Sequence, residues 1–537
     1  MKPRRVPPPR PAGPPAAGVR LGRLFAPVDR LFDRLYGSRW NPLHQTGNLA
    51  ILCFLVTLLT GLYLFLFYKI ATPHASVAQI QSEVWLGGWA RSLHRYAADL
   101  AMVATVLHVV RKLIQGQTWG PRAWAWLSGV ILLAVVFACG WTGLVLVWDT
   151  QAQQIAVQGA RIFDLLPIFA EPISRTFAGH QPVGSSFFFM NLFLHVALPL
   201  GVAAMVAVHV ARLSRPALLP PRPLVWGTLA ALGLLALVWP VALAPEADLL
   251  TLPGEMPIDL LFAFWLPVAA RIPPIAHLAL WIAGFAGLAA LAWLWRPAAA
   301  IATSSVDEDH CSGCTSCYHD CPYEAIAMVR RDRPSRQTSE YVARVDPDLC
   351  VGCGICAAAC APMGVGPRAR TGRDQLAMAR NFADRLAPSG REVAVLACGN
   401  GHEPLFAALG RPGRLLYPTG CSGSVHSSVV ELLLRRGFAG VAVLSCPPRN
   451  CFYREGPKWV AERLFRGREA ELHERVDRRR VLHAAFSAAE LDRIERELAA
   501  FERRLAGIEV VAEAQVDLVA ACDSDEAARL LQEAIGA

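Results

Sequence analysis

Two apolar stretches decide the fold of this chain, because each carries a pair of histidines. The first covers residues 91–111 and reads RSLHRYAADLAMVATVLHVVR, and the second covers residues 187–212 and reads FFFMNLFLHVALPLGVAAMVAVHVAR. In each stretch the histidines are 14 residues apart, and they are His94 and His108, then His195 and His209. On a helix this spacing puts both histidines on one face, roughly 21 Å apart along the axis and within the ~30 Å hydrocarbon thickness of a membrane.

Two such helices side by side place His94 opposite His195 and His108 opposite His209. Imidazole inside a membrane is energetically expensive and is usually kept for function. Two axial imidazoles per site suit haem iron better than zinc, which takes four ligands. Hydrogen bonding within a bundle core is an alternative for any one histidine, but four histidines at matched spacing favour two haems b.

Glycines repeat at the same spacing. Gly47 and Gly61 are 14 residues apart in the preceding apolar segment, and Gly129 and Gly143 are 14 apart in the segment between the histidine stretches. Glycine lets a bulky neighbour approach a helix backbone closely. Ordinary helix packing explains either pair alone, whereas both pairs together favour room for two flat macrocycles. We therefore predict that these glycines border the cofactors.

Several of these residues lie in stretches that resemble cytochrome b of the quinol-oxidising complexes, over roughly residues 40–296. The matching stretches are LLTGLYL at 58–64, RSLHR at 91–95, LHVVR at 107–111 and GLVLVWD at 143–149, with Pro121, Arg122, Trp126 and Gly129 between them. The resemblance implies an all-α transmembrane haem-binding bundle over residues 40–297. It makes Arg91 and Arg111 candidates to pair with haem propionates, which also suits a guanidinium near a haem ligand.

Six membrane spans are predicted in this region. They cover about residues 47–68, 92–113, 126–147, 187–211, 224–244 and 275–295. Before them, residues 1–23 are rich in proline and arginine and are expected to be disordered, whereas residues 24–39 predict an interfacial helix. Basic residues gather in the tail and in the second and fourth connections, so both chain ends are expected in the cytoplasm and the protein in the inner (cytoplasmic) membrane.

The connection between the last two predicted spans resembles the outer quinol-site loop of cytochrome b. The family has Pro-Glu-Trp-Tyr where this chain has PIDL at 257–260. The glutamate that handles a quinol proton is therefore missing from its place. Asp259 and Glu255 are the candidate catalytic residues that take over this role.

The composition changes after this region. The chain has 537 residues, of which 54% are hydrophobic, but charged residues are scarce from Gly47 to Trp295 and frequent after Ala300. A membrane part followed by a soluble part explains this, and the net charge of +9 reflects membrane orientation rather than nucleic-acid binding. Most of the 15 cysteines lie in CxxC runs after residue 310, which favours metal clusters in a reducing compartment over disulfides.

Residues 303–367 carry the most specific motif, and predict a ferredoxin-like α+β segment. CSGCTSCYHDCP begins at Cys311 and CVGCGICAAAC begins at Cys350, and both have the spacing of two-cluster bacterial ferredoxins. In that pattern the fourth cysteine of each run ligates the other cluster, whereas zinc sites use paired cysteines. One [4Fe–4S] cluster is thus assigned to Cys311, Cys314, Cys317 and Cys360, and the other to Cys350, Cys353, Cys356 and Cys321.

Residues 388–466 predict an α/β domain in which three strands run into cysteines. The cysteines are Cys398, Cys421, Cys446 and, five residues later, Cys451. The carboxyl ends of parallel strands meet at one sheet edge, and four thiolates there suit a [2Fe–2S] cluster, although spacing alone also permits buried structural thiols. Arginine and glutamate recur at helical spacing in the next segment, so residues 467–537 are expected to form a solvated helical arm and tail.

The stretches ACGN at 397–400, GCSG at 420–423 and CPPRNCFYREG at 446–456 resemble the delta subunit of methyl-viologen-reducing hydrogenase. That iron–sulfur domain relays electrons between flavin- or hydrogenase-type partners. The resemblance makes Cys398, Cys421, Cys446 and Cys451 the [2Fe–2S] ligands.

The sequence contains no nucleotide loop, dinucleotide fingerprint or nucleophile with a base. We therefore expect an oxidoreductase electron-transfer subunit rather than a self-contained enzyme. A cytoplasmic flavin-containing dehydrogenase, or heterodisulfide-reductase- or hydrogenase-like subunits, is expected to dock on the C-terminal domain. Electrons then pass through the [2Fe–2S] and two [4Fe–4S] clusters to two haems b and on to membrane quinone, and a homodimer is an expected assembly.

Two alternatives remain open at this point. In the first, quinol is oxidised near the outer haem and the membrane potential drives electrons inward to low-potential clusters, at ~2.3 kcal/mol per charge per 100 mV. In the second, the chain is a membrane anchor and adaptor whose haems are structural.

Overall fold

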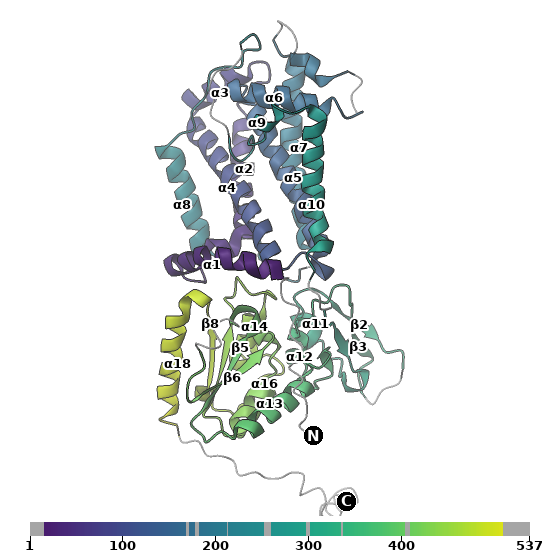
Figure 1. Cartoon of the computed structure of the whole chain (residues 1–537), viewed down its shortest axis with the longest axis vertical. Coiled ribbons are helices and arrows are strands. Elements are labelled where there is room, and N and C mark those ends of the chain that lie inside the picture. Colours follow the sequence, from purple (N-terminus) through teal and green to yellow (C-terminus); the bar gives the residue numbers. More distant parts are fainter. Residues whose placement is uncertain are drawn as a thin grey trace, which may run out of the picture.

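The chain folds into a helical half, residues 16–296, and a cysteine-rich half, residues 301–508, which lie end to end (Figure 1). The computed structural model describes residues 16–167, 171–177, 182–211, 213–251, 259–296, 301–333, 337–402 and 409–508. The cysteine-rich half lies against one end of the helical bundle, and α1 runs across the bundle at this junction (Figure 1).

The six predicted spans each overlap a helix of the helical half. These helices are α2 (Thr46–Phe65), α4 (Gly87–Ile114), α5 (Ala123–Val145), α7 (Ser185–Val210), α8 (Arg222–Val238) and α10 (Pro274–Leu294). Their apolar side chains face outward along much of the bundle, as expected for a surface that meets lipid rather than water. Shorter helices, α3 (Pro73–Ser82), α6 (Thr150–Phe163) and α9 (Leu266–Ala269), lie at the end of the bundle far from the junction (Figure 1).

Within the described residues, four helical segments are long and apolar enough to cross a membrane. They cover residues 42–65, 120–145, 185–210 and 274–294. The chain is therefore a multi-pass membrane protein with four candidate spans. Six crossings stay a prediction, because α8 has only 17 residues and α4 carries charged residues such as Arg95 and Asp99.

The helix α1 (Ala16–Tyr36) begins eight residues before the predicted interfacial helix. The prediction of disorder was therefore wrong for residues 16–23, where the Ala, Leu and Arg residues favour a helix and continue its pattern. Residues 1–15 lie outside the described part of the chain. The helix α1 has an exposed apolar side that includes Leu24, Leu31 and Leu35. Its Asp29 forms a 2.6 Å ion pair with Arg111 of α4 and so connects α1 to the bundle.

The first part of the cysteine-rich half has two small antiparallel sheets and two short helices. The strands β1 (Ser304–Val306) and β4 (Val365–Pro367) form one sheet, and β2 (Ile326–Arg330) and β3 (Tyr341–Val345) form the other. The helices α11 (Ser316–Asp320) and α12 (Ile355–Ala359) each contain the third cysteine of a run and end just before the fourth. This is the ferredoxin-like α+β arrangement that the cysteine spacing predicts.

The second part is a four-stranded parallel sheet with the order β6–β5–β7–β8. The strands are β5 (Val393–Cys398), β6 (Arg414–Thr419), β7 (Gly440–Ser445) and β8 (Val481–Ala485). Alternate side chains pack against the two faces: α13 (Gly372–Leu386), α16 (Ser427–Arg435) and α17 (Gly456–Phe465) cover one, and α18 (Leu491–Leu505) covers the other. Both faces of the sheet are thus buried, as is typical of parallel strands.

The prediction of a solvated helical arm from residue 467 was wrong for the described residues 467–508. Residues 481–485 form β8, which adds the fourth strand to the sheet. The helix α18 then buries Ile494, Leu498, Phe501 and Leu505 against the sheet. The Arg and Glu residues of α18 lie on its outer face, since its apolar stripe repeats every three or four residues, and those of residues 468–480 lie in the segment before β8.

Candidate metal centres

The helices α4 and α7 bring the four histidines together in two pairs. The ring centres of His94 and His195 are 6.3 Å apart, with their planes at 64°. Two metal–nitrogen bonds of about 2.0–2.1 Å each, plus the radii of the two rings, account for this separation. At the other level, His108 and His209 are close enough to interact electrostatically. We name His94 and His195 the outer pair, and His108 and His209, nearer to the junction, the inner pair.

Each of these histidines has a hydroxyl partner on a neighbouring helix. The distances between hydroxyl oxygen and Nδ1 are 3.0 Å for Thr60 and His94, 3.5 Å for Thr46 and His108, 2.9 Å for Ser128 and His209, and 3.1 Å for Thr142 and His195. The Thr60 hydroxyl donates to the Val56 carbonyl at 2.7 Å, so its oxygen accepts from Nδ1. This fixes the Nδ1–H tautomer and leaves Nε2 to bind a metal.

Sequence reasoning missed these hydroxyl residues, although a signal for them was present. Each glycine of the 14-residue repeat directly follows one of them. The dipeptides are Thr46-Gly47, Thr60-Gly61, Ser128-Gly129 and Thr142-Gly143. A hydroxyl–glycine pair thus repeats on α2 and α5 at the same interval as the histidines on α4 and α7.

The four glycines leave room for the imidazole rings. A Cβ atom would lie 2.9 Å from the His108 ring at Gly47, 3.1 Å from the His94 ring at Gly61, 3.3 Å from the His209 ring at Gly129 and 2.8 Å from the His195 ring at Gly143. The bulky neighbour that each glycine admits is therefore the histidine itself. The predicted contact of these glycines with a macrocycle stays a prediction.

We expect Gly143→Ala to weaken haem binding at the outer pair, because the new methyl group collides with the His195 ring. Overpacking of this kind costs about 1–3 kcal/mol. The haem-to-protein ratio, measured from the pyridine haemochrome spectrum, should fall toward half. Gly201→Ala on α7 is the matched control, since nothing lies within 4 Å of its Cβ position. Equal haem content in the two variants contradicts this account.

The two arginines assigned to propionates are engaged with protein groups. Arg91 donates to the Gln81 side chain at 2.7 Å and to the Val241 carbonyl at 2.8 Å. Arg111 pairs with Asp29 of α1. Arg91 lies on the turn before His94 and Arg111 on the turn after His108, so each is positioned at one end of the histidine array. Their role toward propionates stays a prediction.

Asp259, a candidate for quinol proton transfer, forms an ion pair with Arg95, the residue after His94 of the outer pair. Its carboxylate also accepts hydrogen bonds from the backbone N–H groups of Leu261 (3.0 Å) and Phe262 (2.6 Å). These contacts give Asp259 an anchoring role in the loop. Glu255 lies outside the described residues.

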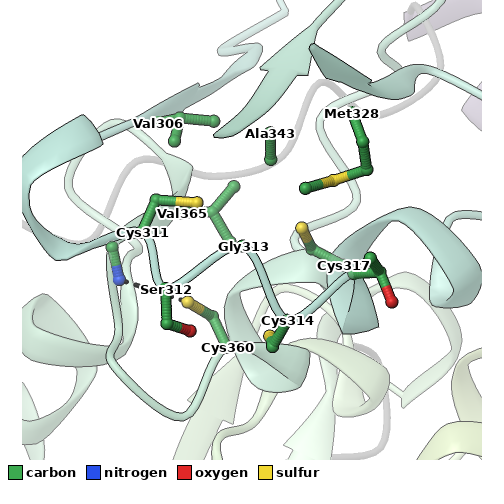
Figure 2. Close-up of a pocket in the computed structure, with 12 residues that line it drawn as sticks. Val306, Cys311, Ser312, Gly313, Cys314, Cys317, Met328, Ala343, Cys360 and Val365 are labelled. Carbon is green, nitrogen blue, oxygen red and sulfur yellow. Dashed lines mark hydrogen bonds between the residues drawn. The ribbon is translucent and has the colours of Figure 1, made fainter. Parts of the chain in front are cut away.

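Four cysteines of the ferredoxin motif surround one cavity (Figure 2). Figure 2 shows Cys311, Cys314, Cys317 and Cys360 around it, with the apolar side chains of Val306, Met328 and Ala343 above them and Val365 beside Cys311. The backbone N–H of Gly364 donates to the Cys360 sulfur at 3.3 Å. This first site brings together the four cysteines that the spacing assigned to one [4Fe–4S] cluster.

The second site is lined by the other four, Cys321, Cys350, Cys353 and Cys356. Ser304 lies 3.2 Å from the Cys356 sulfur, and the Ala325 N–H donates to Cys321 at 3.4 Å. Burial and the neighbouring thiols raise the pKa of Cys356 to about 12. The raised pKa means that a buried thiolate is unfavourable at this site without a positive partner. A bound cluster would supply that partner in place of the proton, because its iron ions carry positive charge. The donor set therefore fits an iron–sulfur cluster.

A third group of thiols lies at the carboxyl ends of β5, β6 and β7. The sulfurs of Cys398 and Cys446 are 3.4 Å apart, and Cys421 and Cys451 both lie close to Gly456, where a Cβ would be 3.2 and 3.4 Å from their sulfurs. A hydrogen bond with Cys398 and burial raise the pKa of Cys421 well above its usual range. Among the residues that the structure describes, no three His, Cys, Asp or Glu side chains are arranged to chelate a single metal ion.

The three sites share one core, because the two parts of the cysteine-rich half are packed together. Cys353, Cys421, Tyr453 and Trp459 belong to the same buried cluster. A buried ion pair of 2.7 Å joins Arg463 of α17 to Asp320 of α11, and Arg463 also donates to the carbonyl groups of residues 423 and 355. Sequence reasoning missed this pair, since its partners are far apart along the chain.

Comparisons with known proteins agree with this division of the chain. The family model described as "Cytochrome b/b6/petB" matches residues 31–216, the "4Fe-4S dicluster domain" matches residues 310–364, and "Methyl-viologen-reducing hydrogenase, delta subunit" matches residues 412–509. The last match includes β8 and α18, which the sequence analysis had left out of that domain.

One similar solved structure is titled "Hyperthermophilic respiratory Complex III". It is 21% identical in sequence, and the match covers 46% of this chain and 74% of that chain with a TM-score of 0.38.

Proposed function

Because this chain joins a cytochrome b/b6 domain, a 4Fe-4S dicluster domain and a hydrogenase delta-subunit domain, we propose that it is a membrane subunit that passes electrons from a cytoplasmic partner to quinone. The cytochrome b domain binds haem b, and the dicluster domain binds two 4Fe-4S clusters. The observation that carries the proposal is the gathering of two histidine pairs and three cysteine sites within one chain, on both sides of a single junction.

The residues have the following roles in this proposal. The outer and inner histidine pairs hold two haems b, and the first and second cysteine sites hold one [4Fe–4S] cluster each. Cys398, Cys421, Cys446 and Cys451 hold a [2Fe–2S] cluster. When bound, these groups supply one-electron oxidation and reduction, and quinone takes two electrons and two protons to become quinol.

The uneven distribution of basic residues supports a cytoplasmic location for both chain ends and for the cysteine-rich half, with six crossings of the inner membrane. The partner is a flavin-containing dehydrogenase, or a set of heterodisulfide-reductase- or hydrogenase-like subunits. Transfer toward quinone is the proposed direction. Iron–sulfur clusters of lower reduction potential than haem b transfer electrons to it spontaneously. A second copy of the chain completes a homodimer.

A redox titration of the purified protein, followed by visible and EPR spectra, tests this proposal. Cluster potentials well below both haem potentials, and haem reoxidation by added quinone that a quinone-site inhibitor blocks, are the expected results. Haem potentials at or below the cluster potentials, with no response to quinone, overturn the proposed direction. Such a result favours transfer from quinol to the clusters instead.

A further inference from the structure

The third cysteine site borders the helical half through the loop that carries Cys451. Asn450, the residue before it, accepts hydrogen bonds from Arg111 at 3.3 Å and from Gln115 at 3.2 Å. Both donors belong to the end of α4 at the junction. A helix rises about 1.5 Å per residue, so Arg111 is roughly 4.5 Å along the axis from His108. The loop of the third site therefore lies at the same end of α4 as the inner histidine pair.

The second cysteine site borders the helical half in the same way. Pro322 and Tyr323 directly follow Cys321, which is one of its four cysteines. The Pro322 carbonyl accepts from the Ser214 N–H at 3.3 Å, just after α7, and the Tyr323 hydroxyl accepts from Arg122, at the start of α5, at 2.8 Å. Two cysteine sites thus lie at the junction, one near the end of α4 and one near the end of α7.

The second and third sites are also neighbours of each other. A Cβ at Gly354, beside Cys353 of the second site, would lie 3.0 Å from Ser424, close after Cys421 of the third site. Tyr453 is buried in the core that contains both Cys353 and Cys421. No solvent layer separates the two sites at this point.

The first cysteine site differs from the other two, because it opens to solvent. Cys314 is exposed and Cys311 is half-buried. All four cysteines of the second site are buried, and so are those of the third site except the half-buried Cys451. Two large aromatic residues next to the site are also exposed. Tyr318 directly follows Cys317 and is 46% exposed, and Tyr341, whose backbone carbonyl would lie 2.7 Å from a Cβ at Gly313, is 53% exposed. Figure 1 shows the β2–β3 hairpin, which helps to line this site, on the outer side of the cysteine-rich half, away from the four-stranded sheet.

We infer that the exposed surface around the first cysteine site, which carries Cys314, Tyr318 and Tyr341, is where a soluble one-electron donor docks, and that the delta-subunit domain is an internal relay at the junction. This inference rests on the proposed function, and it replaces docking on the C-terminal domain. The donor, a reduced iron–sulfur or flavin protein, loses one electron per encounter, and one haem iron changes from ferric to ferrous. Exposed aromatic side chains around a solvent-accessible cysteine suit a partner of this kind, because tyrosines are enriched at protein interfaces.

The test compares reduction of the haems in three full-length, membrane-purified proteins: wild type, the double variant Tyr318→Glu/Tyr341→Glu, and Phe465→Glu. Phe465 is the matched control, since it is a 41% exposed aromatic residue of the delta-subunit domain. Stopped-flow absorbance records haem reduction by a reduced bacterial-type ferredoxin, and separately by reduced methyl viologen, which is too small to need a docking face. EPR spectra confirm that all variants keep the same cluster signals.

The double tyrosine variant is expected to slow reduction by ferredoxin about 30-fold, the effect of losing one interface hot spot, and to leave reduction by methyl viologen unchanged. Phe465→Glu is expected to change neither rate. Slower reduction by ferredoxin in Phe465→Glu, with no change in the tyrosine variant, overturns the inference and leaves the proposed function standing. Absence of haem reduction in the wild type by either donor refutes the proposed function itself.

A second readout does not depend on electron transfer. A water-soluble dysprosium chelate speeds the relaxation of paramagnetic centres near the surface, so it reports on exposure. It is expected to alter the EPR power saturation of only one of the cluster signals, the one that Cys314→Ser removes or changes. Cys451→Ser identifies the signal of the third site. If the chelate alters the power saturation of that signal as much as that of the first site, the inference is overturned.

Discussion

His108→Ala is expected to remove the inner haem and to leave the outer haem in place. In the proposed function His108 is one of the two axial ligands of this haem, and the substitution removes it and leaves a hole beside Gly47, where the ring now lies. Haem iron with a single imidazole in this position is held weakly, so about half of the haem should be lost. The pyridine haemochrome ratio measures this loss, and a redox titration should show one haem transition instead of two.

His277→Ala is the control for this experiment, because His277 is a buried histidine of α10 that belongs to neither pair and hydrogen-bonds to Trp281 at 3.1 Å. It should keep both haems. A His94→Ala variant should show the opposite pattern, with loss of the other transition. Retention of both haems in His108→Ala shows that His108 is not an axial ligand.

Asp320→Asn should destabilise the cysteine-rich half strongly. The Asp320 and Arg463 side chains are 1% and 2% exposed, and Arg468 donates a second hydrogen bond to Asp320 at 2.8 Å. Removing the carboxylate leaves the buried guanidinium without its counter-charge, which costs about 3–5 kcal/mol. The denaturant midpoint for loss of cluster absorbance should therefore fall, and hydrogen exchange should accelerate in both α11 and α17.

Asp332→Asn is the matched control for the second prediction, since Asp332 pairs with Arg344 on the exposed β2–β3 hairpin. Exposed pairs contribute little, so its midpoint should not move measurably. The double variant Asp320→Leu/Arg463→Leu should recover much of the loss, because no unpaired buried charge remains. If Asp320→Asn behaves like Asp332→Asn, the pair does not hold the two parts together.

The features that could be predicted from the sequence are those that repeat locally. The 14-residue interval of the histidines and glycines follows from helix geometry, and the cysteine spacing reflects the short loops that wrap a cluster. Both patterns anticipated which residues the structure brings together. The hydroxyl partners were present beside each glycine, but a lone Thr or Ser in an apolar helix has several ordinary explanations.

Other features could not be predicted because they depend on residues far apart in the sequence. The strand β8 forms only against β7, about 40 residues earlier, and its sequence between charged segments carries a weak signal. The many charged residues of α18 led to the prediction of a solvated helix. The apolar stripe from Ile494 to Leu505, which packs on the sheet, was therefore not recognised. Likewise, docking of the Cys451 loop on α4 joins residues 450 and 111, which no local pattern relates.

The pairing of hydroxyl–glycine helices with histidine helices has a consequence for biosynthesis. In the proposed function each haem site takes one histidine from α4 and one from α7. The hydroxyl–glycine pairs of α2 contact the α4 histidines, and those of α5 contact the α7 histidines. A nascent chain that has inserted α2 and α4 therefore presents two half-sites with a single ligand each. Neither histidine pair is complete until the ribosome has passed residue 209. The proposed haem sites therefore predict that haem binds only after α7 has been inserted, and that it then joins the α2–α4 pair to the α5–α7 pair.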